Sequence, residues 1–151
     1  ATAGSTPFHA PSLRFIDTMG LNDRAVAHAP VVPVQTRLQR YPGHLKGDGA
    51  YVLSRRPDVI VLGPSEGYLG NPPTAWSLTD YQLIASPGFR SDYVPFGFRA
   101  PVTAAEATSP RVRELLDAEG RTLRFIAYLR RDSERARDLA YRGVLLRAPW
   151  E

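Results

Sequence analysis

The polar side chains that could do chemistry are concentrated in the first third of the chain. They are Asp17, Asn22, Asp23, His28, His44 and Lys46. Carboxylates and imidazoles of this kind ligate zinc or manganese and transfer protons near neutral pH. Further along, Glu66 and Tyr68 follow an apolar run, and a flat ring beside a carboxylate suits carbohydrate. The sequence therefore predicts a polar binding site carried on loops, and these eight residues are its candidates.

A metal or acid–base site would use Asp17, Asp23, His28 and His44. Their spacing matches no metal motif, because HExxH, a two-histidine helix pair and a carboxylate-rich calcium loop are all missing. The alternative is that the two carboxylates cap backbone donors, at a strand end and a helix start, while the histidines form hydrogen bonds within a loop. We expect no metal, no other cofactor and no catalytic residue here.

A glycine-rich segment over residues 43–49 could hold an anion or a sugar hydroxyl. Its glycines permit close backbone approach, and His44 and Lys46 add positive charge. It lacks the GxxxxGK[ST] pattern of a P-loop and the GxGxxG fingerprint of a dinucleotide site. The alternative is that the glycines turn the chain and cap a helix that begins near Asp48.

Composition limits the possible classes of protein. The 151 residues suit one domain, and the absence of cysteine excludes disulfides, a thiolate nucleophile and thiolate zinc sites. No apolar run approaches the roughly 20 residues that cross a bilayer. We expect a single soluble domain over residues 1–151. Because Ala1 follows no initiator methionine or signal peptide, we expect it to be a piece of a longer membrane protein.

The net charge of +4 comes largely from arginines in the last third of the chain. Such a surface could meet nucleic acid or anionic headgroups. Acidic residues are interleaved with these arginines, however, which is typical of a solvated face. We therefore expect no nucleic-acid partner.

The large aromatic residues that follow the central apolar run are expected to pack in the core or a lid: Trp76, Tyr81, Phe89, Tyr93 and Phe96.

The elements that must position these residues follow from caps and periodicity. In the first half we expect a strand over 13–17, a helix over 21–29 started by Asn22 or Asp23, a loop over 30–47, a helix over 48–54 capped by Asp48, and a buried strand over 59–62. Residues 63–73 should form a second loop, followed by a helix over 78–85 that is capped by Ser77 or Thr79 and stopped by residues 86–88.

In the second half, residues 89–100 read as an edge strand because they contain Pro95 and Gly97. A helix over 109–119, a strand over 122–131, a helix over 134–141 and a short strand over 144–147 follow. The strand over 122–131 should place four residues on one face: Leu123, Phe125, Ala127 and Leu129. These elements predict an α/β (or α+β) domain, with a small mixed sheet flanked by short helices and joined by long loops rich in proline and glycine.

Several spaced motifs resemble a known family. They lie at residues 15–23 with Ala27 and His28, at 42–46, at 51–53 and at 56–62. Together they resemble the soluble C-terminal region of bacterial multispanning glycosyltransferases of the GT-C type, including arabinofuranosyltransferase-like and mannosyltransferase-like proteins. Residues 3–8 also resemble the stretch where such a domain leaves its last transmembrane helix. The resemblance covers residues 3–62 well and the remainder in outline.

The resemblance implies an accessory role in the bacterial cell envelope. In these enzymes the catalytic carboxylate lies on an extracytoplasmic loop between early membrane helices, which this chain does not contain. The implied role is to assist binding of glycan acceptor or of the headgroup of a polyprenyl-phosphate sugar, at the periplasmic or extracellular face of the cytoplasmic membrane. The implied partners are the membrane-embedded part of the same protein and this carbohydrate ligand. The alternative is a small stand-alone hydrolase that uses Asp17, Asp23, His28 and His44.

Overall fold

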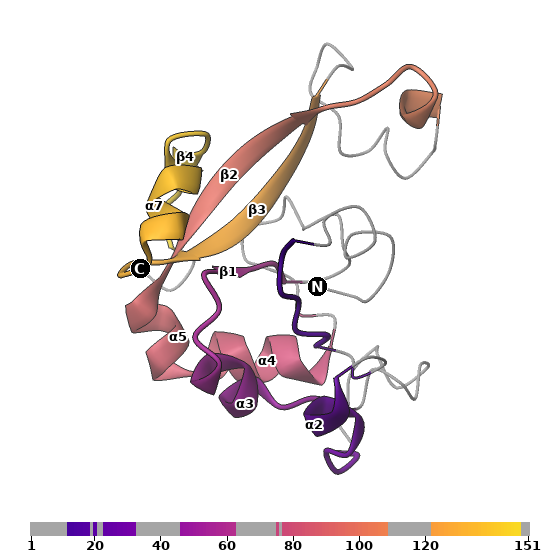
Figure 1. The fold of residues 1–151 in the computed structure, drawn as a ribbon, viewed down its shortest axis with the longest axis vertical. Helices are drawn as coiled ribbons and strands as arrows, with labels where there is room; N and C mark the ends of the chain where they lie inside the picture. The colour runs from indigo at the N-terminus through magenta and orange to yellow at the C-terminus, as the bar shows by residue number, and fades with distance from the viewer. Residues whose placement is uncertain are drawn as a thin grey trace.

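The computed structural model describes residues 12–18, 20, 23–32, 46–62, 75, 77–108 and 122–148 (Figure 1). The first half contains α2 (Arg24–Ala27), α3 (Gly49–Ser54), β1 (Val59–Ile60), α4 (Leu78–Ala85) and α5 (Pro87–Asp92). The second half contains β2 (Tyr93–Pro101), the 3-10 helix η3 (Glu106–Thr108), β3 (Thr122–Arg130), α7 (Glu134–Ala140) and β4 (Val144–Leu145). No helix among these residues is long and apolar enough to cross a membrane.

A four-stranded sheet in the order β1-β3-β2-β4 organises the fold. Its centre is a long hairpin in which β2 and β3 pair from Tyr93↔Arg130 to Pro101↔Thr122. The described strand pairs are all antiparallel. The predicted fold class, an α/β or α+β domain with a small sheet flanked by short helices, is therefore confirmed. The described sheet is antiparallel and not mixed as predicted, which corresponds to the α+β form.

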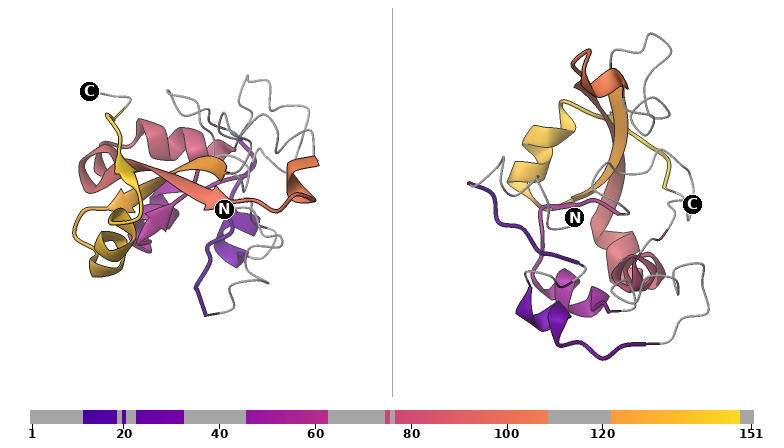
Figure 2. Two further views of the ribbon diagram at one scale, coloured as in Figure 1. Left: turned by 90° about the horizontal axis from the view of Figure 1, so that it is seen from above. Right: turned by 90° about the vertical axis from the view of Figure 1, so that its right-hand side faces the viewer.

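Helices cover both faces of this sheet. Successive side chains of a strand point to opposite faces, so β3 contributes to the packing on both sides. Tyr128 of β3 packs in a cluster with Val52 of α3, Leu83 of α4 and Phe89 of α5. Ala127 and Leu129 face the other way, with Phe125 beside them, and pack against α7 through Ala136. Figures 1 and 2 show α3, α4 and α5 gathered on one side of the hairpin and α7 on the other. The predicted shared face of Phe125, Ala127 and Leu129 is confirmed; the side chain of Leu123 lies outside the described residues.

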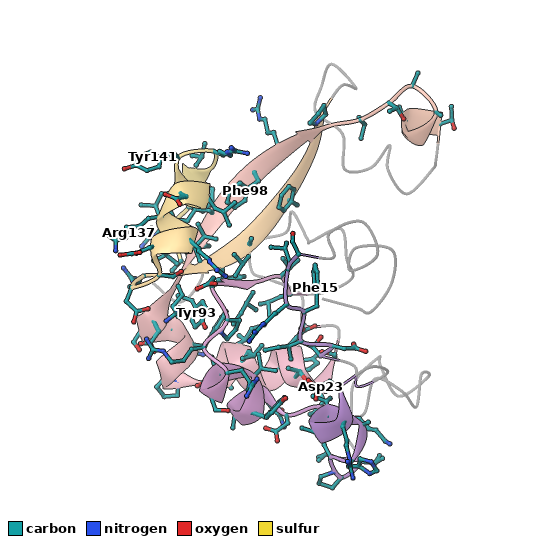
Figure 3. The ribbon with its side chains drawn as sticks, in the orientation of Figure 1. Phe15, Asp23, Tyr93, Phe98, Arg137 and Tyr141 are labelled. Atoms are coloured by element: carbon teal, nitrogen blue, oxygen red, sulfur yellow. The ribbon has the colours of Figure 1, made fainter. Side chains whose placement is uncertain are left out.

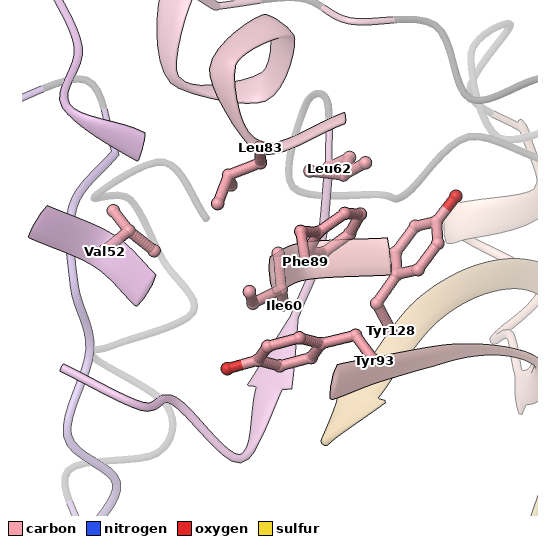
Figure 4. Packing of buried hydrophobic residues seen from close by; sticks show 7 residues of the cluster. All are labelled: Val52, Ile60, Leu62, Leu83, Phe89, Tyr93 and Tyr128. Carbon is pink, nitrogen blue, oxygen red and sulfur yellow. The ribbon is translucent and has the colours of Figure 1, made fainter. Parts of the chain in front are cut away.

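Aromatic rings fill the cluster under α5 (Figure 4). The ring centroid of Phe89 lies 5.4 Å from that of Tyr93 and 5.0 Å from that of Tyr128. The hydroxyl of Tyr93 donates to the carbonyl of Pro57 at 2.8 Å, so the polar end of this buried ring is satisfied. Burial raises the pKa of Tyr93 and of Tyr128 to about 12. The predicted packing is confirmed for Phe89 and Tyr93, and Phe96 packs against the cluster on the other face, whereas Tyr81 is 38% exposed and belongs to neither cluster.

Helix caps explain most of the element boundaries. Asp48 caps α3, Ser77 caps α4 in a reciprocal capping box with Asp80, and Ser133 caps α7. The predicted helices over 48–54, 78–85 and 134–141 are thereby confirmed. The predicted stop after Ala85 is correct, but the same residues start α5, because Ser86 caps it and Pro87 occupies its first turn. The strand predicted from residue 89 therefore begins only at Tyr93.

Two further predictions about strands are wrong. Residues 13–17 form no strand, since no described strand pairs with them; the carbonyl of Asp17 instead accepts a turn hydrogen bond from the backbone N–H of Gly20. Strand β2 is not an edge along its whole length, because β4 pairs with it at Phe96 and Gly97. Pro95 lies where the pairing of β2 with β4 ends. Its carbonyl points toward this side and accepts from the N–H of Leu146. The N–H that proline lacks would point to the same side, so its absence does not interrupt the pairing of β2 with β3.

The remaining expectations are partly outside the described residues. The first strand is shorter than predicted, spanning Val59–Ile60 and not residues 59–62, and the last spans Val144–Leu145 and not 144–147. The helix predicted over 109–119 and the loop predicted over 63–73 lie entirely outside the described residues, as does most of the loop over 30–47.

Candidate functional site

A polar cluster joins α2 to the segment that leads into α3. Asp23 is the N-cap of α2, and its Oδ1 accepts from the backbone N–H of Ala25 at 3.0 Å and of Val26 at 3.3 Å. Its Oδ2 accepts from the hydroxyl of Tyr51 on α3 at 3.2 Å. One carboxylate thus caps a helix and binds a side chain 28 residues away. The capping interpretation of Asp23 is confirmed, and Figure 3 shows this residue at the start of α2.

Lys46 closes the other end of the same helix. Its Nζ donates to the carbonyl of Ala27 at 2.8 Å, where the last carbonyls of α2 lack partners within the helix. A lysine ammonium has two further N–H donors for other acceptors. His28 is the C-cap of α2 and its side chain is exposed. Lys46 and Tyr51 thus contact opposite ends of α2, and His28 directly follows its last residue. We call Asp23, His28, Lys46 and Tyr51 the α2–α3 cluster; the first three are predicted site residues, and Tyr51 is added by the structure.

The α2–α3 cluster rests on the start of α4. Thr79 is buried; its hydroxyl donates to the carbonyl of Thr18 at 3.0 Å and accepts from the backbone N–H of Asp48 at 3.2 Å. The backbone of Gly47 lies so close that a Cβ there would be 2.5 Å from the Thr79 nitrogen. A side chain at position 47 would therefore displace the segment that carries Lys46. Asp17, beside Thr18, is buried as well.

The charges of the cluster set what it can do. Partial burial, and then the hydrogen bond to Asp23, raise the pKa of Tyr51, so its phenol stays protonated and donates at neutral pH. Asp23 is held as an acceptor by Tyr51 and two backbone donors. Among the described residues, the imidazole of His28 and the two remaining donors of Lys46 find no partner, so these groups can meet a ligand. This combination suits hydrogen bonds to a phosphate oxygen or to sugar hydroxyls.

The structure describes half of the predicted site residues. Asp23, His28 and Lys46 lie at the ends of α2, whereas Asp17 is buried directly before the turn at Thr18. Asn22, His44, Glu66 and Tyr68 lie outside the described residues, as does Trp76. Among the described side chains, no group of three or more histidines or carboxylates is placed to hold a metal ion. Sequence reasoning considered Thr79 only as a possible cap of α4, which is Ser77, because a hydroxyl in a helix gives no sign of the distant backbone groups it binds.

A second polar cluster ties α7 to the sheet. Arg130, at the end of β3, donates to Asp58 at 2.9 Å and to Asp132 at 2.9 Å, and the hydroxyl of Ser133 donates to the same Asp58 oxygen at 2.6 Å. Arg56 also pairs with Asp132. The hydrogen bond from Ser133, followed by that from Arg130, lowers the pKa of Asp58 below its ordinary value. Two arginines face two carboxylates here, while the buried Nε of Arg130 has no hydrogen-bond partner among the described residues. Because these contacts hold the start of α7 to the sheet, we call this group the Asp58 clamp.

The comparisons with known proteins place the chain in a family without assigning it a role. The family model described as a domain of unknown function (DUF8728) matches residues 1–112. This range includes the α2–α3 cluster, the first three longer helices and the whole of β2. Neither the curated proteins nor the solved structures contain a match. Since the matched range covers most of the 151 residues, the chain belongs to the DUF8728 family.

Proposed function

We propose that this domain is a non-catalytic, extracytoplasmic accessory part of a bacterial membrane glycosyltransferase that uses polyprenyl-phosphate sugars. In this proposal the α2–α3 cluster helps to bind the glycan acceptor or the headgroup of the donor. The membrane-embedded part of the same protein is its structural partner and carries the catalytic residues. The domain acts at the periplasmic or extracellular face of the cytoplasmic membrane and has no turnover alone.

The observation that carries this proposal is the meeting of two separate motifs in one cluster. The motifs at residues 15–28 and 42–46 are those in which the sequence resembles GT-C-type enzymes. In the fold, Lys46 of the second motif binds Ala27 of the first, and Tyr51, from the next motif, binds Asp23. Residues that serve only their own loops need not meet. Their meeting supports a shared role as well as a structural one.

The chemistry of the cluster fits the ligand. A polyprenyl-phosphate sugar presents a phosphate and several hydroxyls, which need cationic donors and polar acceptors. Lys46 lies half-buried at the C-terminal end of α2, and His28 is exposed beside it. Binding through these two side chains would weaken on substitution of either one, without any change to the buried clusters of the sheet.

The test is an NMR titration of the isotope-labelled chain. The probes are farnesyl-phosphoryl-mannose and farnesyl-phosphoryl-arabinofuranose, compared with farnesyl phosphate and with the free sugars. We expect the amide signals of residues 23–28 and 46–51 to shift with the two sugar phosphates. His28→Ala should weaken binding several-fold, because that side chain is exposed and its loss should leave the fold intact. Arg99→Ala on β2, an exposed residue outside the cluster, is the matched control.

Two outcomes would contradict the proposal. One is the absence of shifts around α2 and α3 with every probe. The other is release of sugar from a probe by the chain alone, because turnover would favour the stand-alone hydrolase. In that case the loss of activity in Asp23→Asn and His28→Ala would identify the reacting groups.

A further inference from the structure

Exposed apolar side chains gather where α7 leads into β4. Among the described residues, Tyr141 is 91% exposed, Val144 69%, Leu145 63% and Leu139 38%. The other large apolar side chains that are exposed are spread over three segments, at residues 13, 31–32 and 81. We call the surface formed by Leu139, Tyr141, Val144 and Leu145, together with Arg142, the α7–β4 edge.

The backbone holds this edge in place. The N–H of Arg142 donates to the carbonyl of Leu139 at 2.9 Å, and the N–H of Gly143 donates to that of Ala140 at 3.1 Å, so a closed turn joins the helix to the strand. Figure 3 shows Tyr141 pointing away from the sheet at the end of α7. The exposure of these side chains therefore belongs to a folded, hydrogen-bonded segment.

The edge is convex. Val144 pairs with Gly97 and Leu145 with Phe96, so the two side chains lie on opposite faces of the sheet. Both are nevertheless exposed, because β4 is the last strand of the described sheet. The apolar surface therefore wraps around the rim of the sheet. A lipid surface can surround apolar side chains on both faces of β4, whereas a flat protein partner would contact only one face.

The charge of the edge is positive. Residues 139–148 contain Arg142 and Arg147 and no acidic residue. The acidic residues nearest in sequence are Asp138, on α7 beside Arg137, and Glu151. A surface that combines an exposed tyrosine, two aliphatic side chains and arginine complements the interface of an anionic bilayer, where apolar groups enter the headgroup region and guanidinium groups meet phosphates.

Two protein partners fit less well. A second copy that paired β4 with β4 antiparallel would place Arg142 and Arg147 of one chain beside those of the other, and the like charges would repel. An added peptide strand would gain few hydrogen bonds, because β4 is only two residues long. Neither partner would use the apolar side chains on both faces of the rim.

We propose that the α7–β4 edge docks on an anionic lipid surface, with Tyr141, Val144 and Leu145 in the headgroup region and Arg142 at the lipid phosphates. This goes beyond the proposed function, because it concerns residues outside the α2–α3 cluster. It holds or fails independently of glycan binding. In the cell, such docking would fix the orientation of the domain relative to the membrane.

The test is sedimentation of the chain with vesicles of phosphatidylcholine, with and without phosphatidylglycerol. We expect binding only when phosphatidylglycerol is present and weaker binding at high salt, because salt screens the charges. Leu145→Ser should lower the partition coefficient by about tenfold, since a leucine leaves the apolar region. Arg142→Glu should lower it by at least about fivefold, the factor expected of one basic side chain near such a surface.

Matched controls separate the edge from the rest of the surface. Leu13→Ser removes a leucine that is 60% exposed, close to the 63% of Leu145. Arg99→Glu changes the charge by the same amount as Arg142→Glu, at an exposed position on β2. Neither should alter binding.

Three results would overturn the proposal. The first is a chain that does not bind anionic vesicles. The second is an equal loss of binding in Leu145→Ser and Leu13→Ser. The third is a dimer, detected by light scattering, that Leu145→Ser converts to a monomer; this result would assign the edge to contact between two copies. Circular dichroism of each variant must match that of the parent chain for the comparison to count.

Discussion

The two faces of the sheet are covered in opposite ways. On one face, three helices bury a cluster in which Phe89 and Leu83 have no exposed surface and Tyr93 and Tyr128 retain 2%. On the other face, the seven-residue helix α7 contributes one buried alanine, Ala136, and leaves Leu139 exposed. Polar contacts make up for the smaller apolar contact there, because the Asp58 clamp ties the start of α7 to β3 and to the residue before β1.

The two faces are therefore stabilised by different interactions. The face under α3, α4 and α5 is held by apolar burial, which pH and salt affect little. The face under α7 is held partly by charged hydrogen bonds, which pH and salt do affect. The α2–α3 cluster lies beside the face that apolar burial holds, whereas the α7–β4 edge lies on the face that charged hydrogen bonds partly hold.

The difference in burial between the two faces can be tested by shortening one side chain on each of them. Phe89→Ala should lower the free energy of unfolding by about 3–5 kcal/mol, because it removes a fully buried ring that contacts Tyr93 and Tyr128. Leu139→Ala should change it by about 0.5 kcal/mol or less, because that side chain is already 38% exposed. Urea unfolding of both variants measures the contrast. Similar losses in the two variants would mean that the faces contribute equally.

A pair of glycines tests how tightly the α2–α3 cluster is supported. In Gly47→Ala the new Cβ would lie 2.5 Å from the Thr79 nitrogen and 2.6 Å from its Oγ1, so we expect a loss of about 1–3 kcal/mol. In Gly88→Ala, within α5, the nearest atom is the Ser86 Oγ at 3.7 Å. That change should be neutral or should stabilise by up to about 1 kcal/mol. Equal thermal stabilities of the two variants would show that Gly47 is not crowded.

A smaller effect is expected from the contact that joins α3 to α2. Tyr51→Phe removes the hydroxyl that donates to Asp23 and should cost about 0.5–1.5 kcal/mol. Tyr81→Phe is the control, because Tyr81 is 38% exposed on α4 and its change should have no measurable effect. Denaturant midpoints measure both. If Tyr51→Phe also leaves the midpoint unchanged, the contact with Asp23 does not hold the cluster together.

The smallest effect concerns the Asp58 clamp and pH. The pKa of Asp58 is lower in the folded chain than its unfolded value near about 4, so between the two values the unfolded chain binds more protons. The stabilisation is therefore complete above about pH 4 and is lost as pH falls through the folded pKa. Asp58 is 35% exposed, so screening limits its contribution to about 0.2–1 kcal/mol.

Hydrogen exchange of the α7 amides would detect this loss. We expect their protection factors, which correct for the slower intrinsic exchange at low pH, to fall on acidification before those of α4 do, and Asp58→Asn should reduce the pH dependence. Asp138→Asn, on the exposed face of α7, should leave the pH dependence unchanged. Simultaneous loosening of α4 and α7 would contradict a separate polar attachment of α7.

The parts of the fold that sequence predicts are those set by neighbouring residues. Asp48 and Ser77 each accept from a backbone N–H three residues ahead, so their helices could be placed from the sequence. The alternation along β3 likewise identified one buried face. By contrast, residues 13–17 have a strand-like pattern but find no partner strand, and a pattern alone cannot show that. Ser86 stops one helix and starts another, and its second role was missed.

The candidate site was predictable in its residue types but not in its contacts. The carboxylate of Asp23 and the amine of Lys46 were identified as candidates, and capping explained one of the roles of Asp23. Their partners lie 28 and 19 residues away, which only the folded chain reveals. The strand order β1-β3-β2-β4 is non-local in the same way. The exposed rim at β4 depends on that order, so the sequence could not reveal it either.

The most direct test of the central claim, that this domain serves a membrane glycosyltransferase, is to read the coding sequence upstream of Ala1. We expect an open reading frame that continues upstream of Ala1 and encodes several apolar segments of about 20 residues each. A start codon within a few residues of Ala1 would contradict it, because the domain would then act alone and its α2–α3 cluster would have to be tested for hydrolysis.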